Sequence, residues 1–156
     1  MINKKIFITA IGTDSGKTLV SAITCEALHA DYWKPVQAGL PRDADTVKSL
    51  LTNTKSSIHP EAYILNSPMS PHAAAKRDNV LIDLANIKIP VTNNHLIIEG
   101  AGGCLVPLNN KDFVIDLAPY LHCEIIVVAN LYLGSINHTL LTLEALKKRN
   151  LSIKGI

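Results

Sequence analysis

Three apolar segments stand out in the chain, at residues 6–9, 95–99 and 124–129. They are short, mostly apolar and rich in β-branched residues, which is typical of strands that are buried on both faces. Helical segments alternate with them. The longest of these are expected at residues 17–30, 112–121 and 137–148. This alternation predicts an α/β fold of three layers, in which a mostly parallel sheet carries helices on both faces.

The remaining elements are shorter. Residues 31–36 have the composition of a strand, which should end near Pro35 because proline has no N–H to donate to a sheet. Residues 151–156 look like the start of a further strand. A domain rarely ends in this way, so we expect residues 1–156 to be a single domain that lacks the C-terminal part of a longer protein. We also expect a strand at residues 63–65 and helices at residues 46–51, 73–77 and 80–87.

The composition is that of a compact globular protein. Of the 156 residues, 47% are hydrophobic and 18% are charged, which suits one domain with a sizeable core. The net charge is only +2 and no basic run is present, so we do not expect nucleic acid as a partner. No apolar stretch has the length of a membrane span, and we expect neither a signal peptide nor a membrane partner. Three cysteines without CxxC spacing favour reduced thiols and a cytoplasmic protein.

Residues 5–18, KIFITAIGTDSGKT, join a buried strand to a helix through a loop of small residues. Glycines let the N–H groups of such a loop turn toward phosphate oxygens, while the lysine adds positive charge and the threonine hydroxyl can bind Mg²⁺. The first glycine comes one residue later than in the common pattern, and the alternative is a strand-to-helix turn with a solvated lysine. We favour a phosphate-binding loop made of Gly12, Thr13, Asp14, Ser15, Gly16, Lys17 and Thr18.

Further candidate residues follow the other strands, because ligands bind beyond the carboxyl ends of a parallel sheet. Glu99 ends an apolar strand, where phosphate-loop enzymes place a metal-binding or water-positioning acid. The alternative is a charge that marks the exit of the strand into solvent. Asp43 and Asp45 begin a helix, and either capping or metal binding would suit them. Lys34 ends a strand at the same edge, although a lysine before proline is often solvated.

The chain resembles the dethiobiotin synthetase family in six segments that occur in the family's order and cover essentially the whole sequence. The segments are the GTDSGKT loop, Lys34-Pro35-Val36-Gln37, the helix start with Asp43 and Asp45, Ser70-Pro71-His72, Glu99-Gly100-Ala101-Gly102-Gly103 and Leu133-Gly134-Ser135-Ile136-Asn137-His138. The resemblance implies a P-loop fold and a cyclo-ligase of biotin biosynthesis. Such an enzyme carboxylates 7,8-diaminononanoate with CO₂ and uses ATP to close the ring, which gives dethiobiotin, ADP and phosphate.

The resemblance also implies the catalytic and nucleotide-binding residues. Lys17 would hold the β- and γ-phosphates, and Lys34 would neutralise the carbamate and the transferring phosphoryl group. ATP would contact the phosphate-binding loop together with Glu99, Gly102 and Gly103. Mg²⁺ would be the metal cofactor, with Thr18, Asp45 and Glu99 as its ligands.

The remaining implied contacts concern the diamine substrate. It would contact Lys34 and Ala38 in one subunit. In the family, the substrate carboxylate binds at a helix N-terminus of the partner subunit, so the resemblance implies a homodimer with composite sites. The residues in question are Gly134, Ser135, Ile136 and Asn137.

Some features depart from the family, and two other functions compete. Ala10 replaces a common glycine, Ala38 stands where a hydroxyl residue is usual, and the family continues past Ile156 with a strand and helices that contact the nucleotide. Cobyrinate and cobyric acid synthetases are one alternative, but the sequence has no amidotransferase domain. A MinD/ParA-like ATP-binding switch without small-molecule synthesis is the other, but residues 11–14 lack the second lysine that is typical of such switches.

Overall fold

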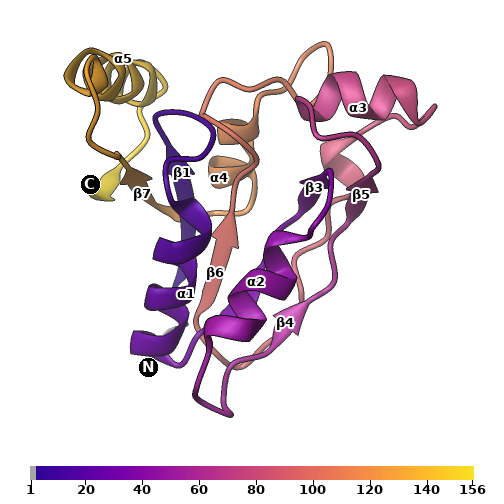
Figure 1. The fold of residues 1–156 in the computed structure, drawn as a ribbon, viewed down its shortest axis with the longest axis vertical. Coiled ribbons are helices and arrows are strands. Elements are labelled where there is room, and N and C mark those ends of the chain that lie inside the picture. Colours follow the sequence, from indigo (N-terminus) through magenta and orange to yellow (C-terminus); the bar gives the residue numbers. More distant parts are fainter. Residues whose placement is uncertain (1–2) are drawn as a thin grey trace.

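The computed structural model describes residues 3–156, and its centre is a six-stranded sheet. The strands of this sheet are β1 (Lys5–Ala10), β2 (Asp31–Trp33), β4 (Ile58–His59), β6 (Leu96–Glu99), β7 (Glu124–Val128) and β8 (Ile153–Gly155). Their order is β4-β2-β6-β1-β7-β8, and every neighbouring pair is parallel (Figure 1). A separate parallel pair joins β3 (Val36–Ala38) to β5 (Tyr63–Leu65). The predicted parallel sheet is confirmed.

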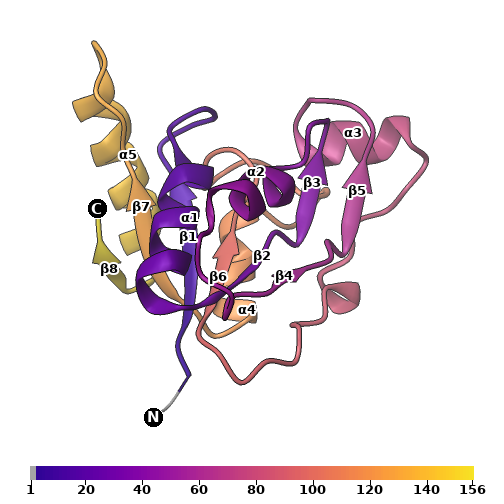
Figure 2. The ribbon, with the colours of Figure 1, turned by 60° about the horizontal axis from the view of Figure 1, so that its bottom comes forward.

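Helices cover both faces of this sheet. The helices are α1 (Lys17–Leu28), α2 (Asp43–Leu50), α3 (Pro71–Arg77), α4 (Leu117–Tyr120) and α5 (Ser135–Lys148), with the 3₁₀ turns η1 (Leu84–Asn86) and η2 (Val114–Asp116). Of these, α3 packs against the separate pair of β3 and β5. One core cluster joins Ile6, Ile8 and Tyr32 to buried residues of α1 and α2, and the other joins Phe7 and Ile98 to η2 and α4. Figure 2 shows α1 and α2 on one side of the sheet and α4 on the other. Because alternate residues of a strand point to opposite faces, one strand supplies both cores.

The expected strand at residues 31–36 is two strands in the structure. β2 ends at Trp33 and β3 begins at Val36 in the second sheet. The carbonyl of Pro35, between them, accepts hydrogen bonds from the N–H groups of Ala62 (2.9 Å) and Tyr63 (3.0 Å). Proline cannot donate to a strand ladder, so the chain leaves the main sheet at this point. As a result, Lys34 lies at the carboxyl edge of the main sheet.

The prediction of one helix over residues 112–121 is wrong in its extent. Pro107 and Phe113 form an antiparallel bridge, so the backbone is still extended where the helix was expected to begin. The carboxylate of Asp116 then accepts a hydrogen bond of 2.7 Å from the Phe113 N–H, which starts the 3₁₀ turn η2. The single turn of α4 completes the segment.

Residues 80–87 also differ from the expectation, since they contain only η1 and no amphipathic helix. Ile82 and Ile87 are buried on either side of this turn, so the apolar residues reach the core from a largely irregular backbone. The strand predicted within residues 151–156 is present as β8, which pairs with β7. None of the helices in residues 3–156 combines the length and the apolar character needed to cross a lipid bilayer.

Candidate active site

The loop between β1 and α1 turns sharply at its end. Gly16 precedes α1 with a φ of 95°, a left-handed conformation that glycine adopts without strain. Asp14 has a φ of 56°, which aspartate tolerates better than most residues. Lys17, the first residue of α1, is buried, and its Nζ donates to the carbonyl oxygen of Gly12 at 3.2 Å. The ammonium group therefore lies beside the N-terminus of α1, a combination that favours phosphate.

The electrostatic environment of Lys17 also favours an anion. Burial lowers the pKa of Lys17, and the nearby ammonium of Lys34 lowers it further, while Glu99, Asp43 and Asp14 act in the opposite direction. The charge on Lys17 is therefore incompletely compensated by the carboxylates around it. A bound phosphate chain would stabilise this charge.

Glu99 ends β6 and is almost completely buried, with 1% of its surface exposed. Its Oε1 accepts hydrogen bonds from the Thr18 hydroxyl at 3.0 Å and from Lys34 Nζ at 3.1 Å. Its Oε2 accepts one from the Tyr32 hydroxyl, also at 3.0 Å. A buried carboxylate needs such partners, and these come from α1, from β2 and from the residue that follows β2. The carboxylate is therefore part of a defined cluster and does not mark an exit into solvent.

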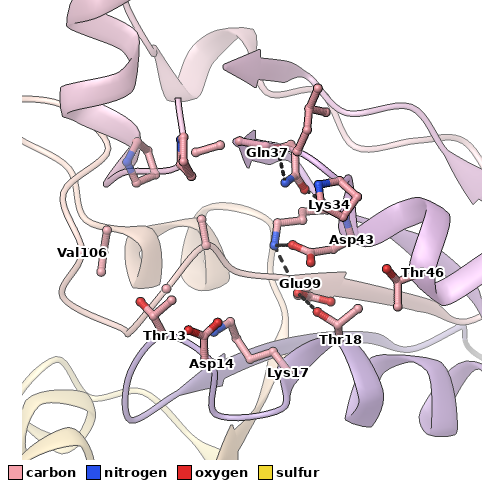
Figure 3. Close-up of a pocket in the computed structure, with 18 of the residues that line it drawn as sticks. Thr13, Asp14, Lys17, Thr18, Lys34, Gln37, Asp43, Thr46, Glu99 and Val106 are labelled. Carbon is pink, nitrogen blue, oxygen red and sulfur yellow. Dashed lines mark hydrogen bonds and ion pairs between the residues drawn. The ribbon is translucent and has the colours of Figure 1, made fainter. Parts of the chain in front are cut away.

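Lys34 is the cation of this cluster. Its ammonium group forms ion pairs with Glu99 and with Asp43, the first residue of α2. Burial opposes the charge on Lys34, but the two carboxylates outweigh it and raise the pKa of Lys34 above its ordinary value. Burial and the Glu99 carboxylate likewise raise the pKa of Tyr32, which keeps its hydroxyl protonated as a donor. Figure 3 shows the side chains of Lys34, Asp43, Glu99 and Thr18 pointing toward one another.

These groups border a cavity of about 810 Å³ at the carboxyl edge of the sheet. The phosphate-binding loop forms one wall, residues 34–43 and 68–71 form another, and residues 99–106 form a third. The volume is within the range of small-molecule sites. Its lining is mixed, because the charged cluster is flanked by apolar side chains. Those apolar residues are Leu19, Ala38, Leu40, Pro41, Leu50, Pro68, Met69, Pro71, Ala101 and Val106.

The glycines after Glu99 bring two loops into close contact. A Cβ on Gly103 would lie 3.5 Å from Gly12 Cα and 3.6 Å from the Ala10 carbonyl oxygen. Gly102 has a φ of 68°, and a Cβ there would come within 2.9 Å of Val106. Gly103 thus lies within van der Waals distance of the phosphate-binding loop, and a side chain at Gly102 would be strained by its backbone conformation and would crowd Val106.

The structure brings together most of the residues expected at the site. Gly12, Ser15 and Gly103 lie in the same loops as the cavity residues but do not line it. Asp45 lies apart, because its carboxylate accepts hydrogen bonds of 2.8 and 3.0 Å from Arg42 and its side chain is 57% exposed. The α5 N-terminus, Gly134 to Asn137, also lies outside the lining. The expected residues that do line the cavity are Thr13, Asp14, Gly16, Lys17, Thr18, Lys34, Ala38, Asp43, Glu99 and Gly102.

Two buried side chains of the site were not expected. Tyr32 holds Glu99, and Gln37 connects β3 to α2 by donating from Nε2 to the Gly39 carbonyl (2.9 Å) and accepting from the Asp43 N–H (3.3 Å). Gln37 occurs in a motif quoted for the family resemblance, so that motif was a usable signal. No comparable signal marked Tyr32, because its contact with Glu99 depends on the alignment of β2 with β6.

The site offers hard oxygen donors to a metal ion. The Thr18 hydroxyl and the carboxylates of Glu99 and Asp43 face one region, and Mg²⁺ typically binds through one or two such groups together with phosphate oxygens and water. In residues 3–156 no group of three or more histidine, cysteine, aspartate or glutamate side chains could hold a metal ion by itself. The donor set therefore fits Mg²⁺ bound with a nucleotide better than a metal held by protein alone.

Comparison with known proteins bears on the family to which the chain belongs. The model of a family described as an AAA domain matches residues 4–156. The ATP-dependent dethiobiotin synthetase BioD of Cytophaga hutchinsonii is 63% identical over 155 residues, which are 98% of this chain and 75% of that protein. The enzyme of the same name from Christiangramia forsetii is 53% identical, with 98% and 74% covered. That from Paramagnetospirillum magneticum is 44% identical, with 97% and 74% covered.

Proposed function

Since the chain belongs to the ATP-dependent dethiobiotin synthetase family, we propose that it converts 7,8-diaminononanoate, CO₂ and ATP to dethiobiotin, ADP and phosphate in the cavity described above. One observation supports placing this reaction in the cavity. The ammonium group of Lys34 is held by Asp43 and Glu99 at the same edge of the sheet as Lys17 and Thr18. A phosphate-binding loop thus adjoins a buried cation that a second anionic substrate can reach.

The reaction requires three bond-forming steps. An amine nitrogen of the diamine adds to CO₂ and loses a proton, which gives a carbamate. A carbamate oxygen then attacks the γ-phosphorus of ATP, the bond between that phosphorus and the β,γ-bridging oxygen breaks, and ADP leaves. Finally, the second amine attacks the carbamoyl carbon, the C–O bond to phosphate breaks, and the amine loses a proton as the ring closes.

Lys17 and Lys34 divide the electrostatic work of these steps. Lys17 and the N–H groups of the phosphate-binding loop would hold the β- and γ-phosphates, replacing the bond that Lys17 makes to Gly12. Lys34 would neutralise the carbamate and the charge on the transferring phosphoryl group. Catalysis of phosphoryl transfer consists mainly of such positioning and charge stabilisation. The buried position of Lys34 strengthens this effect because the local dielectric is low.

Thr18 and Glu99 would hold Mg²⁺, and Asp43 is better placed than Asp45 to complete the set. When bound, Mg²⁺ supplies positive charge to the β- and γ-phosphate oxygens. Asp45 could join only if its carboxylate left Arg42. Asp43 already faces Lys34 and lines the cavity.

A homodimer would complete the substrate site. In one chain the α5 N-terminus, from Gly134 to Asn137, does not line the cavity, so a second copy is the simplest source of this anion-binding end. Apolar residues around it are strongly exposed, with Leu131 at 97%, Leu133 at 103% and Ile136 at 78%. Such exposure is typical of a surface that is covered in an assembly. Sedimentation of the purified chain would distinguish a dimer from a monomer.

The test is ADP release from ATP, Mg²⁺ and bicarbonate, with and without the diamine, together with detection of the ureido product by mass. We expect release that depends on the diamine and matches product in amount. Lys17→Ala should abolish it, whereas the matched control Lys48→Ala, at an exposed lysine of α2, should not change it. Release without diamine would instead favour a nucleotide switch.

A further inference from the structure

Tyr32 is a buried polar residue that does not line the cavity but contacts one of its central groups. It lies in β2 and is 0% exposed. Its hydroxyl donates to Glu99 Oε2 at 3.0 Å, and Glu99 lines the cavity. A tyrosine in such a core is more costly to bury than phenylalanine unless its hydroxyl has a partner. The partner here is the carboxylate that the proposed function assigns to the metal.

The sheet itself brings these two residues together. Tyr32 is aligned with Ile97 across the parallel pair of β2 and β6, and Glu99 is two residues further along β6. Residues two apart in a strand point to the same face, so Tyr32 and Glu99 share one face as diagonal neighbours. A tyrosine side chain is long enough to span that diagonal.

The two oxygens of Glu99 have different partners. Oε1 accepts from Thr18 and Lys34, both of which line the cavity, whereas Oε2 accepts from Tyr32 on the core side. The tyrosine ring is held by the apolar cluster that includes Ile6, Ile8 and Ile97, so its hydroxyl has a fixed position. A fixed donor on one oxygen restricts rotation of the whole carboxylate.

We infer that Tyr32 is a positioning residue, which orients Glu99 so that Oε1 faces Thr18, Lys34 and the metal bound with the nucleotide. This inference rests on the proposed function, because it assumes that Glu99 is a metal ligand. Hydrogen-bond partners of ligating carboxylates commonly affect metal affinity by about 10- to 100-fold. Thr18 and Lys34 line the cavity, where a ligand could also contact them, whereas Tyr32 is enclosed in the core.

The experiment measures Mn²⁺ binding by electron paramagnetic resonance in the presence of a non-hydrolysable ATP analogue. In Tyr32→Phe, which keeps the ring and removes the hydroxyl, we expect binding to be weakened by about tenfold. Affinity for the analogue without metal should be unchanged. The matched control is Tyr63→Phe in β5, which loses a hydroxyl that is hydrogen-bonded to the backbone of Asp83 and should bind Mn²⁺ like the wild type.

A double-mutant cycle separates positioning from a general loss of structure. If Tyr32 acts through Glu99, Tyr32→Phe should cause no further loss of Mn²⁺ affinity in a Glu99→Gln background. Binding is expressed per folded protein, with the folded fraction taken from urea unfolding of each variant. Wild-type Mn²⁺ affinity in Tyr32→Phe, or equal losses in both backgrounds, would overturn the inference. Wild-type affinity in Glu99→Gln would instead overturn the metal site itself, which is a failure of the proposed function.

Discussion

Two buried carboxylates, at opposite ends of two neighbouring strands, have similar exposure and different surroundings. Asp31, at the start of β2, is 3% exposed, and Glu99, at the end of β6, is 1% exposed. Asp31 accepts hydrogen bonds from Thr92 (2.6 Å), Asn94 (2.8 Å) and the Ser57 N–H (2.9 Å). Its remaining partner is His59 Nε2 at 2.8 Å.

The difference between them is the kind of partner and the access to a cavity. Among residues 3–156, no lysine or arginine forms an ion pair with Asp31, and the lining of the site does not include it. Its partners connect β2 to β4 and to the segment before β6. Two partners of Glu99, Thr18 and Lys34, line the cavity, and Glu99 forms an ion pair with the buried ammonium group of Lys34. Burial of a carboxylate alone thus does not indicate function, whereas burial beside a cavity and a cation does.

The cation provides the largest expected contrast. Lys34→Gln keeps a donor for Glu99 but removes the charge that would neutralise the carbamate and the phosphoryl group. We expect kcat to fall by about 100- to 1,000-fold, with a much smaller change in affinity for the ATP analogue. Lys48→Gln, at an exposed position, is the control and should leave kcat unchanged. Equal losses of kcat and nucleotide affinity would contradict a role for Lys34 in the chemistry.

A second comparison separates the two acids at the start of α2. Asp43 contacts Lys34 and lines the cavity, while Asp45 pairs with Arg42 in solvent. We therefore expect Asp43→Asn to lower kcat by about tenfold and Asp45→Asn to change it by less than about twofold. Steady-state kinetics over a range of Mg²⁺ concentrations measures both. A larger loss of kcat in Asp45→Asn than in Asp43→Asn would favour Asp45 as the metal ligand. It would also imply that Arg42 releases the Asp45 carboxylate when nucleotide binds.

Substitution of Asp31, at the opposite end of the strands, should change the stability of the protein. Asp31→Asn places an amide against the three donors from Ser57, Thr92 and Asn94, so we expect the free energy of unfolding to fall by about 2 kcal/mol. Urea unfolding measures this change. An unchanged midpoint would show that the Asp31 network does not stabilise the sheet.

The smallest expected effect is a loss of stability in acid. Hydrogen bonds from the side chains of Thr52 and Asn53, with those from their N–H groups, lower the pKa of Glu26 from 4.5 to about 2. Burial opposes ionisation of Asp31, but its hydrogen bonds outweigh this and lower the pKa of Asp31. A lowered pKa in the folded state stabilises the protein above the unfolded pKa, and this stabilisation is lost as the pH falls through the folded value.

For Glu26 this window runs from pH 4.5 down to about 2. Urea unfolding at several pH values should therefore show stability that declines across it. The decline should be shallower in Glu26→Gln than in the wild type. An identical pH dependence in both proteins would exclude a contribution from Glu26.

Features that depend on neighbouring residues could be predicted from the sequence, whereas features that depend on residues far apart along the chain could not. The phosphate-binding loop and Glu99 were found because a local motif and a continuous apolar strand mark them. The Asp31 network was not, since Asp31 is 61 residues from Thr92 and 63 from Asn94. Tyr32 similarly needed the register of β2 against β6.

The errors in the fold prediction have local physical causes as well. The strand at residues 31–36 was divided by Pro35, whose effect on the ladder was expected but whose transfer of the chain to a second sheet was not. The helix at residues 112–121 was shortened by the bridge of Pro107 with Phe113, a pairing that the hydrophobic pattern does not encode.

The most direct test applies one chemical change to both buried carboxylates, in Glu99→Gln and Asp31→Asn. Diamine-dependent ADP release is measured at equal concentrations of folded protein, as determined by urea unfolding. We predict that Glu99→Gln loses about 100-fold or more in turnover, while Asp31→Asn keeps turnover within about twofold of the wild type. Comparable losses in the two variants, or near-normal turnover in Glu99→Gln, would contradict the assignment of Glu99 to the active site and of Asp31 to the fold.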